Sequence, residues 1–130
     1  MKILGIDHIV LTVQNIDASV QFYESVLGMT KVRFGDDRIA LKFGNAKINL
    51  HQLGHEFEPK AKTPKPGSAD LCLITETRIE EAIAHVRGAG VEILAGPVQR
   101  TGAMGPISSF YFRDPDGNLI EVAKYGSSTE

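Results

Sequence analysis

Hydrophobic and polar residues alternate along residues 6–14, IDHIVLTVQ. The apolar side chains of one face are Ile9, Leu11 and Val13. Alternation with this period predicts a half-buried β-strand. The apolar residues that come next recur every three or four positions, which predicts a helix capped by Asn15 or Asp17. Gly28 ends this helix, because glycine adopts the left-handed C-cap conformation without strain.

Three further β-type runs follow the helix and are separated by the turn signals GDD and GNA. The runs are MTKVRFG, RIALKFG and AKINLHQL. With the first strand and the helix, they give the order β-α-β-β-β for residues 5–53. Residues 54–68 contain three prolines and three lysines. Such a composition does not sustain a core, so it predicts a connector.

The same order of elements returns in residues 69–125, which indicates an internal repeat. The predicted elements are the strand ADLCLIT, the helix RIEEAIAHVRGAG and the strands GVEILAGPV, SSFYFRD and NLIEVAKY. An offset of 62 positions places His8 opposite Asp70, and an offset of 70 places His51 opposite Glu121. The additional residues of the second half fall in the glycine-rich segment QRTGAMGPI, which we expect to be a loop beside the site.

Composition limits what such a chain does. The chain of 130 residues is 42% hydrophobic, which is enough to bury a core as one domain spanning 1–130. Its formal net charge is −2, with acidic and basic residues interspersed, so we expect neither a nucleic-acid nor a membrane partner. The single cysteine, Cys72, excludes a disulfide framework, and the first residues lack the pattern of a signal peptide. We therefore expect a cytoplasmic protein that acts on a small molecule.

Four residues with metal-binding side chains oppose the apolar face of the strand in which they stand. They are His8, His51, Asp70 and Glu121. If the helices cover the apolar faces, two curved sheets would gather these four side chains in one cleft. Two imidazoles with one or two carboxylates suit a borderline divalent cation. Asp70 has a second interpretation, as a residue that caps the turn at the start of its strand.

Several motifs carry a family resemblance. DHIVLTV followed by FYESVLGM, and the closing FRDPDGNLIEV, resemble the vicinal oxygen chelate superfamily of glyoxalases, bleomycin-resistance proteins and dioxygenases. FGNAKINLHQLGHEFEPKA and GPVQRTGAMGPISS are similar to the glyoxalase-domain-containing protein 5 group and to bacterial virulence-associated proteins labelled as lactoylglutathione lyases. The resemblance implies an α+β fold in which two tandem βαβββ modules form curved mixed sheets around a metal cleft.

The resemblance also implies a set of ligands. The family's first-strand ligand falls on His8, its last-strand ligand in the first half on His51, and its final carboxylate on Glu121. The remaining position, commonly His in metal-binding members, is Asp70, as a fourth ligand or as a partner of a ligand His. Bacterial glyoxalase I enzymes usually carry an Arg where this chain has Thr12, which weakens the case for glutathione as cosubstrate.

A divalent cation with open positions chelates a substrate that has two neighbouring oxygens and lowers the energy of an enediolate as a proton leaves carbon. The resemblance therefore implies a metal-dependent, lactoylglutathione lyase-like lyase or isomerase. Its cation is nickel, zinc, manganese or iron, and Glu121 serves as both ligand and proton shuttle. Arg100 and Thr101, in the glycine-rich segment, are placed to close over the substrate or to bind its anionic group.

Two other functions suit the same residues. Two His and one Glu also form the facial triad of Fe(II) enzymes, which would make the protein an extradiol-type dioxygenase. A bleomycin-resistance-like protein would bind a small molecule between paired sheets without chemistry. Because family members form their cleft within one chain or by exchange between chains, we expect a homodimer.

Overall fold

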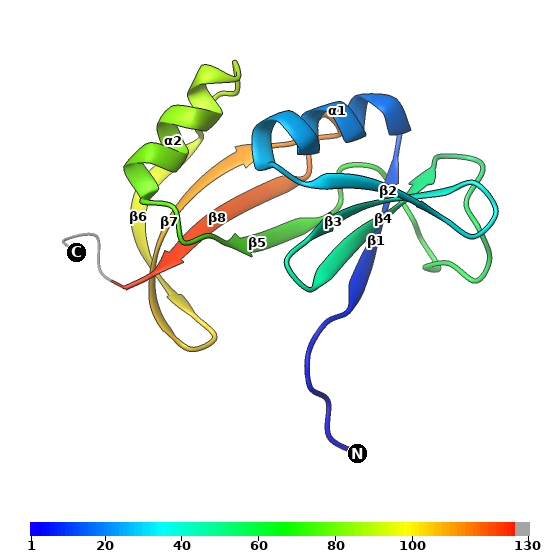
Figure 1. The fold of residues 1–130 in the computed structure, drawn as a ribbon, viewed down its shortest axis with the longest axis horizontal. Helices are drawn as coiled ribbons and strands as arrows, with labels where there is room; N and C mark the ends of the chain where they lie inside the picture. The colour runs from blue at the N-terminus through cyan, green and yellow to red at the C-terminus, as the bar shows by residue number, and fades with distance from the viewer. Residues whose placement is uncertain (127–130) are drawn as a thin grey trace. The chain divides into compact units, whose positions relative to one another are not determined.

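The computed structural model describes residues 1–126, in which two helices and eight strands form. The first half of the chain contains β1 (His8–Val13), α1 (Ile16–Leu27), β2 (Thr30–Phe34), β3 (Arg38–Phe43) and β4 (Ala46–Gln52). The second half contains β5 (Asp70–Ile74), α2 (Ile79–Gly88), β6 (Ala95–Gly102), β7 (Gly105–Arg113) and β8 (Leu119–Tyr125). Each half is a four-stranded sheet with one helix (Figure 1). The predicted α+β fold of two βαβββ modules is confirmed.

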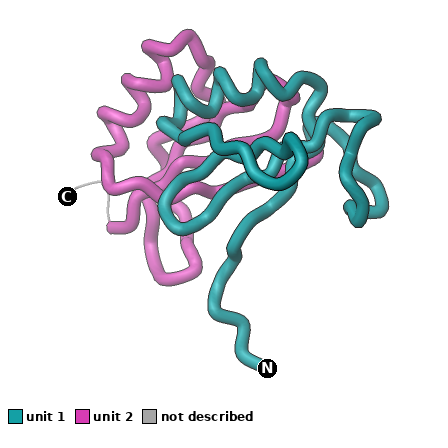
Figure 2. Tube along the Cα trace, turned by 45° about the vertical axis from the view of Figure 1, so that its right-hand side comes forward, with its two compact units in different colours: residues 1–67 teal, residues 68–130 magenta. Residues whose placement is uncertain are grey.

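The chain divides into two compact units, one of residues 1–67 and one that begins at Ser68 (Figure 2). The sequence predicts a connector at 54–68, and this segment forms neither helix nor strand. All of it except Ser68 belongs to the first unit. Within residues 1–126, no helix is long and apolar enough to cross a membrane.

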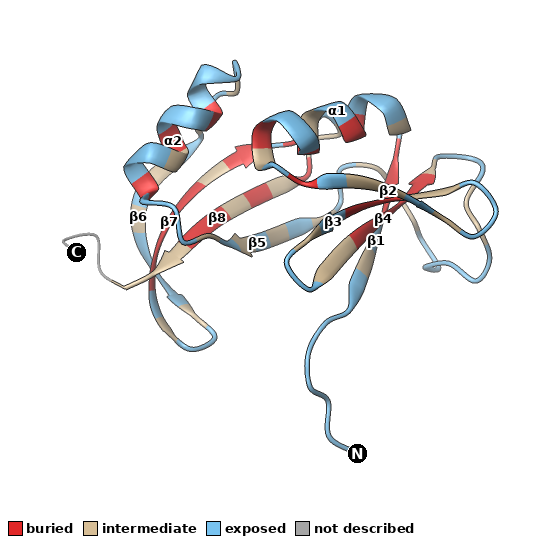
Figure 3. Cartoon of the chain, viewed as in Figure 1, coloured by how far each residue is buried: buried red, intermediate tan, exposed pale blue. Residues whose placement is uncertain are grey.

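In the first module the strand order is β1-β4-β3-β2, with β1 parallel to β4 and the other pairs antiparallel. Asn15, not Asp17, caps α1, since its side-chain oxygen accepts a hydrogen bond from the Ala18 amide at 2.9 Å. Gly28 ends the helix with a φ of 67°, in the left-handed region. The apolar faces of α1 and of the sheet form the core, with Tyr23 fully buried (Figure 3).

In the second module the strand order is β5-β8-β7-β6, again with one parallel pair, β5 and β8. Helix α2 packs against β7. The core here is formed by buried side chains of the central strands and by the apolar face of α2. These residues are Phe110, Phe112, Ile120, Val122, Ile79, Ile83 and Val86. Because these strand residues all share one face, the opposite face is left for Glu121 and its neighbours.

The prediction that QRTGAMGPI, residues 99–107, is a loop is wrong. These residues form the end of β6, a two-residue turn and the start of β7, in which Gly102 pairs with Gly105. Glycine suggested a loop, but here it permits the tight reversal of a hairpin. The strand predicted at 90–98 begins only at Ala95, where a bulge shifts the register.

Candidate functional site

Glu121 stands in the middle of β8, on the face opposite the buried Ile120 and Val122. Two neighbouring strands contribute the residues beside it: β5 pairs Cys72 with Glu121, and β7 pairs Tyr111 with it. Side chains that pair across adjacent strands lie on the same face, about 5 Å apart at Cβ. The carboxylate is therefore flanked by a thiol on one side and a phenol on the other.

A cavity of about 430 Å³ opens on this face of the second module. Its walls come from β5, β8 and the β6–β7 hairpin. They consist of Cys72, Ile74, Arg100, Thr101, Gly102, Ala103, Ile107, Tyr111, Glu121 and Tyr125. The cavity combines apolar walls with a few polar groups of both charges, which is the usual composition of a small-molecule site.

Burial and the neighbouring Glu121 carboxylate both raise the pKa of the Cys72 thiol. Its pKa rises to about 11, and partial burial of the thiol is the largest cause. The next causes are the negative charge of Glu121 and the hydrogen bond between this carboxylate and the thiol. The charge of Asp70 acts in the same direction. The thiol therefore stays protonated at neutral pH, so it serves as a hydrogen-bond partner of the carboxylate and not as a nucleophile.

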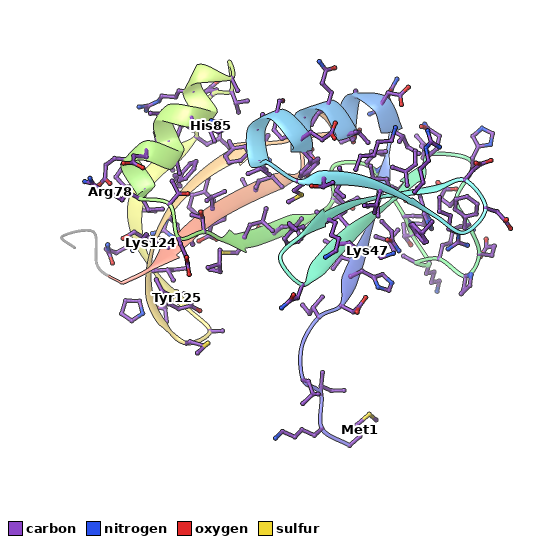
Figure 4. All side chains as sticks on the ribbon, viewed as in Figure 1. Met1, Lys47, Arg78, His85, Lys124 and Tyr125 are labelled. Carbon is purple, nitrogen blue, oxygen red and sulfur yellow. The ribbon has the colours of Figure 1, made fainter. Side chains whose placement is uncertain are left out.

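Two tyrosine hydroxyls accept hydrogen bonds from β6 and from the β6–β7 turn. The Arg100 Nε donates a hydrogen bond to the Tyr111 hydroxyl at 3.1 Å, and its guanidinium carbon lies 5.6 Å from the centre of that ring. The Met104 amide at the hairpin turn donates to the Tyr125 hydroxyl at 3.2 Å. Tyr125, labelled in Figure 4, follows Glu121 by four residues on the same face of β8.

Asp70 begins β5 and is exposed. It pairs with Leu119, two positions before Glu121, so both carboxylates lie on one face of the sheet. At about 3.3 Å per residue along the strand and about 5 Å between strands, their Cα atoms are about 8 Å apart. Two carboxylates at this spacing are able to approach a common cation.

In the first module His8 lies at the start of β1 and is exposed. Its Nδ1 lies 2.8 Å from Oδ1 of Asp7, and the hydrogen bond to His8 is the main cause that lowers the pKa of Asp7. A carboxylate on one ring nitrogen orients the imidazole and leaves Nε2 for a metal, which is the usual arrangement around ligating histidines.

His51, in β4, differs from His8 in its burial and in its hydrogen bonding. It is 6% exposed, and its Nδ1 has no hydrogen-bond partner within the described part of the chain. Its ring meets that of Phe57 edge-on, with 5.5 Å between the ring centres. The guanidinium of Arg38 lies over the Phe57 ring, 4.3 Å from the centre of that ring. Burial, followed by the charge of Arg38, lowers the pKa of His51, and Glu56 opposes this shift. His51 is therefore neutral at neutral pH.

The two histidines share a face of the sheet but lie at different positions along it. His8 pairs with Lys47, whereas His51 pairs with Thr12, four positions further along β1. This offset corresponds to about 13 Å, while two nitrogens that bind one ion lie within about 4 Å of each other. Among residues 1–126, no group of three or more His, Cys, Asp or Glu side chains lies close enough to hold a metal. The predicted ligand set stays a prediction, since its members belong to two separate compact units.

Two residues beside the candidate site residues were not predicted from the sequence, Tyr125 and Asp7. Tyr125 continues the face of Glu121 at every second residue of β8, so the alternation of the strand was the signal for it. Asp7 precedes His8 directly, and a carboxylate next to a candidate ligand His is a recognisable pattern.

Two modules of four strands and one helix, with a carboxylate-bearing cavity on one sheet, define the class as a glyoxalase-like α+β protein. The chain belongs to the Glyoxalase/Bleomycin resistance protein/Dioxygenase superfamily, whose family model matches residues 5–122. The family and fold predicted from the sequence motifs are confirmed. The lactoylglutathione lyase of Agrobacterium tumefaciens, 20% identical, shares this fold with a TM-score of 0.72 over 93% of each chain.

Nearer relatives resemble the chain over almost its whole length. The virulence protein STM3117 of Salmonella typhimurium is 58% identical over 96% of this chain and 87% of its own length. The glyoxalase domain-containing protein RDO1 of Mycosarcoma maydis is 50% identical over 96% of this chain and 70% of its own. The solved integron cassette protein VCH_CASS1 from V. cholerae is 63% identical, with a TM-score of 0.95 over 97% of this chain and 98% of that one.

The superfamily also includes more distant metalloenzymes. The metallothiol transferase FosB of Shouchella clausii is 29% identical over 91% of this chain and 78% of its own length. Similarity at this level supports a common scaffold, while the reaction depends on the residues of each site.

Proposed function

We propose that this protein is a divalent-metal-dependent lyase or isomerase of glyoxalase type, which acts on a small substrate with two neighbouring oxygens. The observation that carries the proposal is the position of Glu121. Its carboxylate lines the cavity, and within residues 1–126 it has no Lys, Arg or His partner in an ion pair. A carboxylate that lines a cavity without a cationic partner is suited to accept a proton or to bind a cation.

The side chains proposed to hold the metal are of types that bind divalent cations. His8 would bind through Nε2, because Asp7 holds its other ring nitrogen. Glu121 and Asp70 would supply oxygens from one face of the second module. His51 is the predicted ligand that the strand register supports least, given its offset from His8. When bound, a divalent cation polarises a carbonyl oxygen and stabilises the negative charge that develops as a proton leaves the neighbouring carbon.

The other work is done by the chain itself. Glu121 removes the proton from one carbon of the substrate and returns it to the next, in the manner of a general base that becomes a general acid. The Cys72 thiol and the Tyr111 ring flank this carboxylate, and the thiol forms a hydrogen bond with it. Ile74 and Ile107 form apolar walls of the cavity.

The test is exchange of substrate carbon-bound hydrogen with solvent deuterium, followed by NMR with dihydroxyacetone and with hemithioacetals of methylglyoxal. Glu121→Gln keeps the size of the side chain and removes its basicity, so the exchange rate is expected to fall about 100-fold or more. Glu92→Gln, at an exposed carboxylate away from the cavity, is the matched control. Full exchange by the Glu121→Gln protein contradicts the proposal.

Two measurements separate the alternatives. Oxygen uptake with catechols in the presence of Fe(II) identifies an extradiol-type dioxygenase. Metal analysis of anaerobically purified protein, with His8→Ala beside the wild type, tests the ligand assignment without reference to turnover. Ligand binding that needs neither a metal nor His8 favours a bleomycin-resistance-like binding protein.

The assembly we infer is a homodimer. Residues 1–7 are exposed throughout and include Ile3, Leu4 and Ile6, which are 75%, 90% and 77% exposed. They precede β1, which is an edge strand of its sheet. An apolar segment beside an open strand edge is a surface that another chain covers favourably. We also infer that the protein works in the reducing cytoplasm, consistent with its single cysteine.

A further inference from the structure

Strand β5 carries Asp70 and Cys72 but packs its own side chains only partly. Its five residues are exposed or half-buried, whereas Ile120 and Val122 of the neighbouring β8 are buried. The strand lies at the edge of its sheet and is hydrogen-bonded to β8. Register is specified weakly where neither face of a strand is buried. The position of β5 therefore depends strongly on the hydrogen bonds that hold it.

Asn118, which directly precedes β8, binds the residue that directly precedes β5. Its side-chain Oδ1 accepts a hydrogen bond from the Ala69 amide at 2.9 Å. The backbone amide of Leu119 donates to the Ala69 carbonyl at 3.0 Å. Both backbone groups of Ala69 are therefore held one residue before Asp70. The parallel pairing of β5 with β8 continues from this contact.

The Asn118 side chain is itself oriented by Asp114. Its Nδ2 donates to Oδ2 of Asp114 at 2.7 Å, while Oδ1 of Asp114 accepts from the Asn118 and Asp116 amides at 2.9 Å each. Both side chains are buried, with 1% of Asn118 and 6% of Asp114 exposed. A reversed amide would place its oxygen against the carboxylate and its nitrogen against the Ala69 amide. The buried pair therefore allows one orientation of Asn118.

Closure of the β7–β8 turn does not account for this contact. The turn is closed by its own backbone, since the Asp114 amide donates to the Asn118 carbonyl at 3.1 Å and the Gly117 amide donates to the Asp114 carbonyl at 3.0 Å. The Asn118 side chain instead reaches Ala69, 49 positions away in sequence. Its contact is with the start of another strand.

We propose that Asn118, held by Asp114, is a positioning residue of the cavity. It fixes the start of β5 and thereby sets Asp70 and Cys72 beside Glu121. The alignment of the strand does not depend on the proposed function. Its effect on a cation that Asp70 and Glu121 share does rest on that function, so the two effects are measured separately.

The first experiment follows backbone amides of the second module by hydrogen–deuterium exchange with NMR detection. Asn118→Ala removes the acceptor of the Ala69 amide. We expect amides of residues 69–74 to exchange about tenfold or more faster, relative to amides of β7 in the same protein. Asn45→Ala, at an exposed turn between β3 and β4, is the matched control and should leave this ratio unchanged. An unchanged ratio in Asn118→Ala overturns the proposal.

An exchange of the two side chains tests the contact without removing it. Asp114→Asn alone opposes two amide groups, and Asn118→Asp alone opposes two carboxylates, so each should loosen β5. In the double variant Asp114→Asn/Asn118→Asp, the amide at position 114 donates to the carboxylate at position 118, whose other oxygen accepts from the Ala69 amide. We expect its exchange ratio to return to within about threefold of the wild type. A double variant as loose as the single variants contradicts the role of this pair.

A purely structural role of Asn118 predicts a different result. In that case Asn118→Ala would lower the unfolding midpoint and accelerate exchange in β5, β7 and β8 alike. Faster exchange confined to β5 and the residue before it is the signature of positioning.

The second experiment measures Mn(II) binding by calorimetry in the wild type and in Asn118→Ala, Asp70→Ala and the double variant. If Asn118 acts through Asp70, Asn118→Ala should weaken Mn(II) binding about threefold or more in the wild-type background and leave it unchanged in Asp70→Ala. Equal losses in both backgrounds would overturn action through Asp70. Loosened β5 in a protein that binds no Mn(II) would uphold the positioning of the strand and contradict the proposed metal-dependent function.

Discussion

Gly96 is the position at which the fold of the second module is most sensitive to one added methyl group. Its φ of 119° lies where side chains other than glycine are strained. A Cβ at this position would lie 2.5 Å from Cβ of Phe110 and 2.7 Å from the carbonyl oxygen of Ser109. Neither atom is able to move aside, since Phe110 is fully buried in the core and the carbonyl belongs to the central strand β7.

The cost of Gly96→Ala has two parts. An unfavourable backbone conformation costs about 1–3 kcal/mol, and forcing an atom into a packed core costs about 1–3 kcal/mol more. We therefore expect the free energy of unfolding to fall by about 2–6 kcal/mol, measured by urea denaturation monitored by circular dichroism. A loss of this size is a large part of the stability of a typical domain.

Gly88→Ala is the matched control. Gly88 is the last residue of α2, and a Cβ there would meet nothing within 4 Å. Alanine in a helix is more favourable than glycine by about 0.5–1 kcal/mol, so this variant should be slightly more stable than the wild type. A loss below about 1 kcal/mol for Gly96→Ala, or equal losses for both variants, would refute the steric argument.

Two further predictions concern the cavity thiol and the assembly. Because the pKa of Cys72 rises from 9.0 to about 11 in the fold, iodoacetamide should alkylate it about tenfold more slowly at pH 8 than a free thiol, and Glu121→Gln should speed the reaction. The folded state keeps this proton more tightly, so the associated stability is complete below pH 9 and declines as the pH rises toward 11. Equal rates in both proteins, followed by mass spectrometry, would contradict the role of Glu121. Deletion of residues 1–6 should shift the protein toward monomer in analytical ultracentrifugation, and a wild type that sediments as a stable monomer would refute the homodimer.

The fold was predictable because its periodic signals are local. Alternation identifies the strands and the face of each, and Gly28 and Asn15 mark the ends of α1. The start of β6 was not predictable in the same way, since Gly96 and its bulge interrupt the alternation. There the decisive contact is with Phe110, fourteen positions away in sequence, and no local pattern reports it.

For the site, the sequence predicted on which face of its strand each residue lies. It did not predict the position of that residue along the sheet relative to the neighbouring strands. Glu121, Asp70 and Cys72 share a face as their alternation requires, and the cavity confirms that two of them line one space. His8 and His51 also share a face, yet their register separates them by four positions. The period of a strand says nothing about register, which is set by turns and by pairing over many residues. The two histidines therefore lie at different positions along the sheet, and their role as ligands stays a prediction.

Asp70 also bears on the choice of metal, and this leads to a last prediction. If His8, Asp70 and Glu121 hold the cation, oxygen donors outnumber nitrogen, and such a set favours manganese or ferrous iron over zinc more than a histidine-rich set does. Asp70→His replaces one oxygen with an imidazole nitrogen at the same position of β5. We expect it to shift competition between Mn(II) and Zn(II) toward zinc by about tenfold, measured by metal analysis after equilibration with both ions. Asp36→His, at an exposed turn of the first module, controls for histidine added elsewhere. An unchanged ratio in Asp70→His would contradict contact between this carboxylate and the cation.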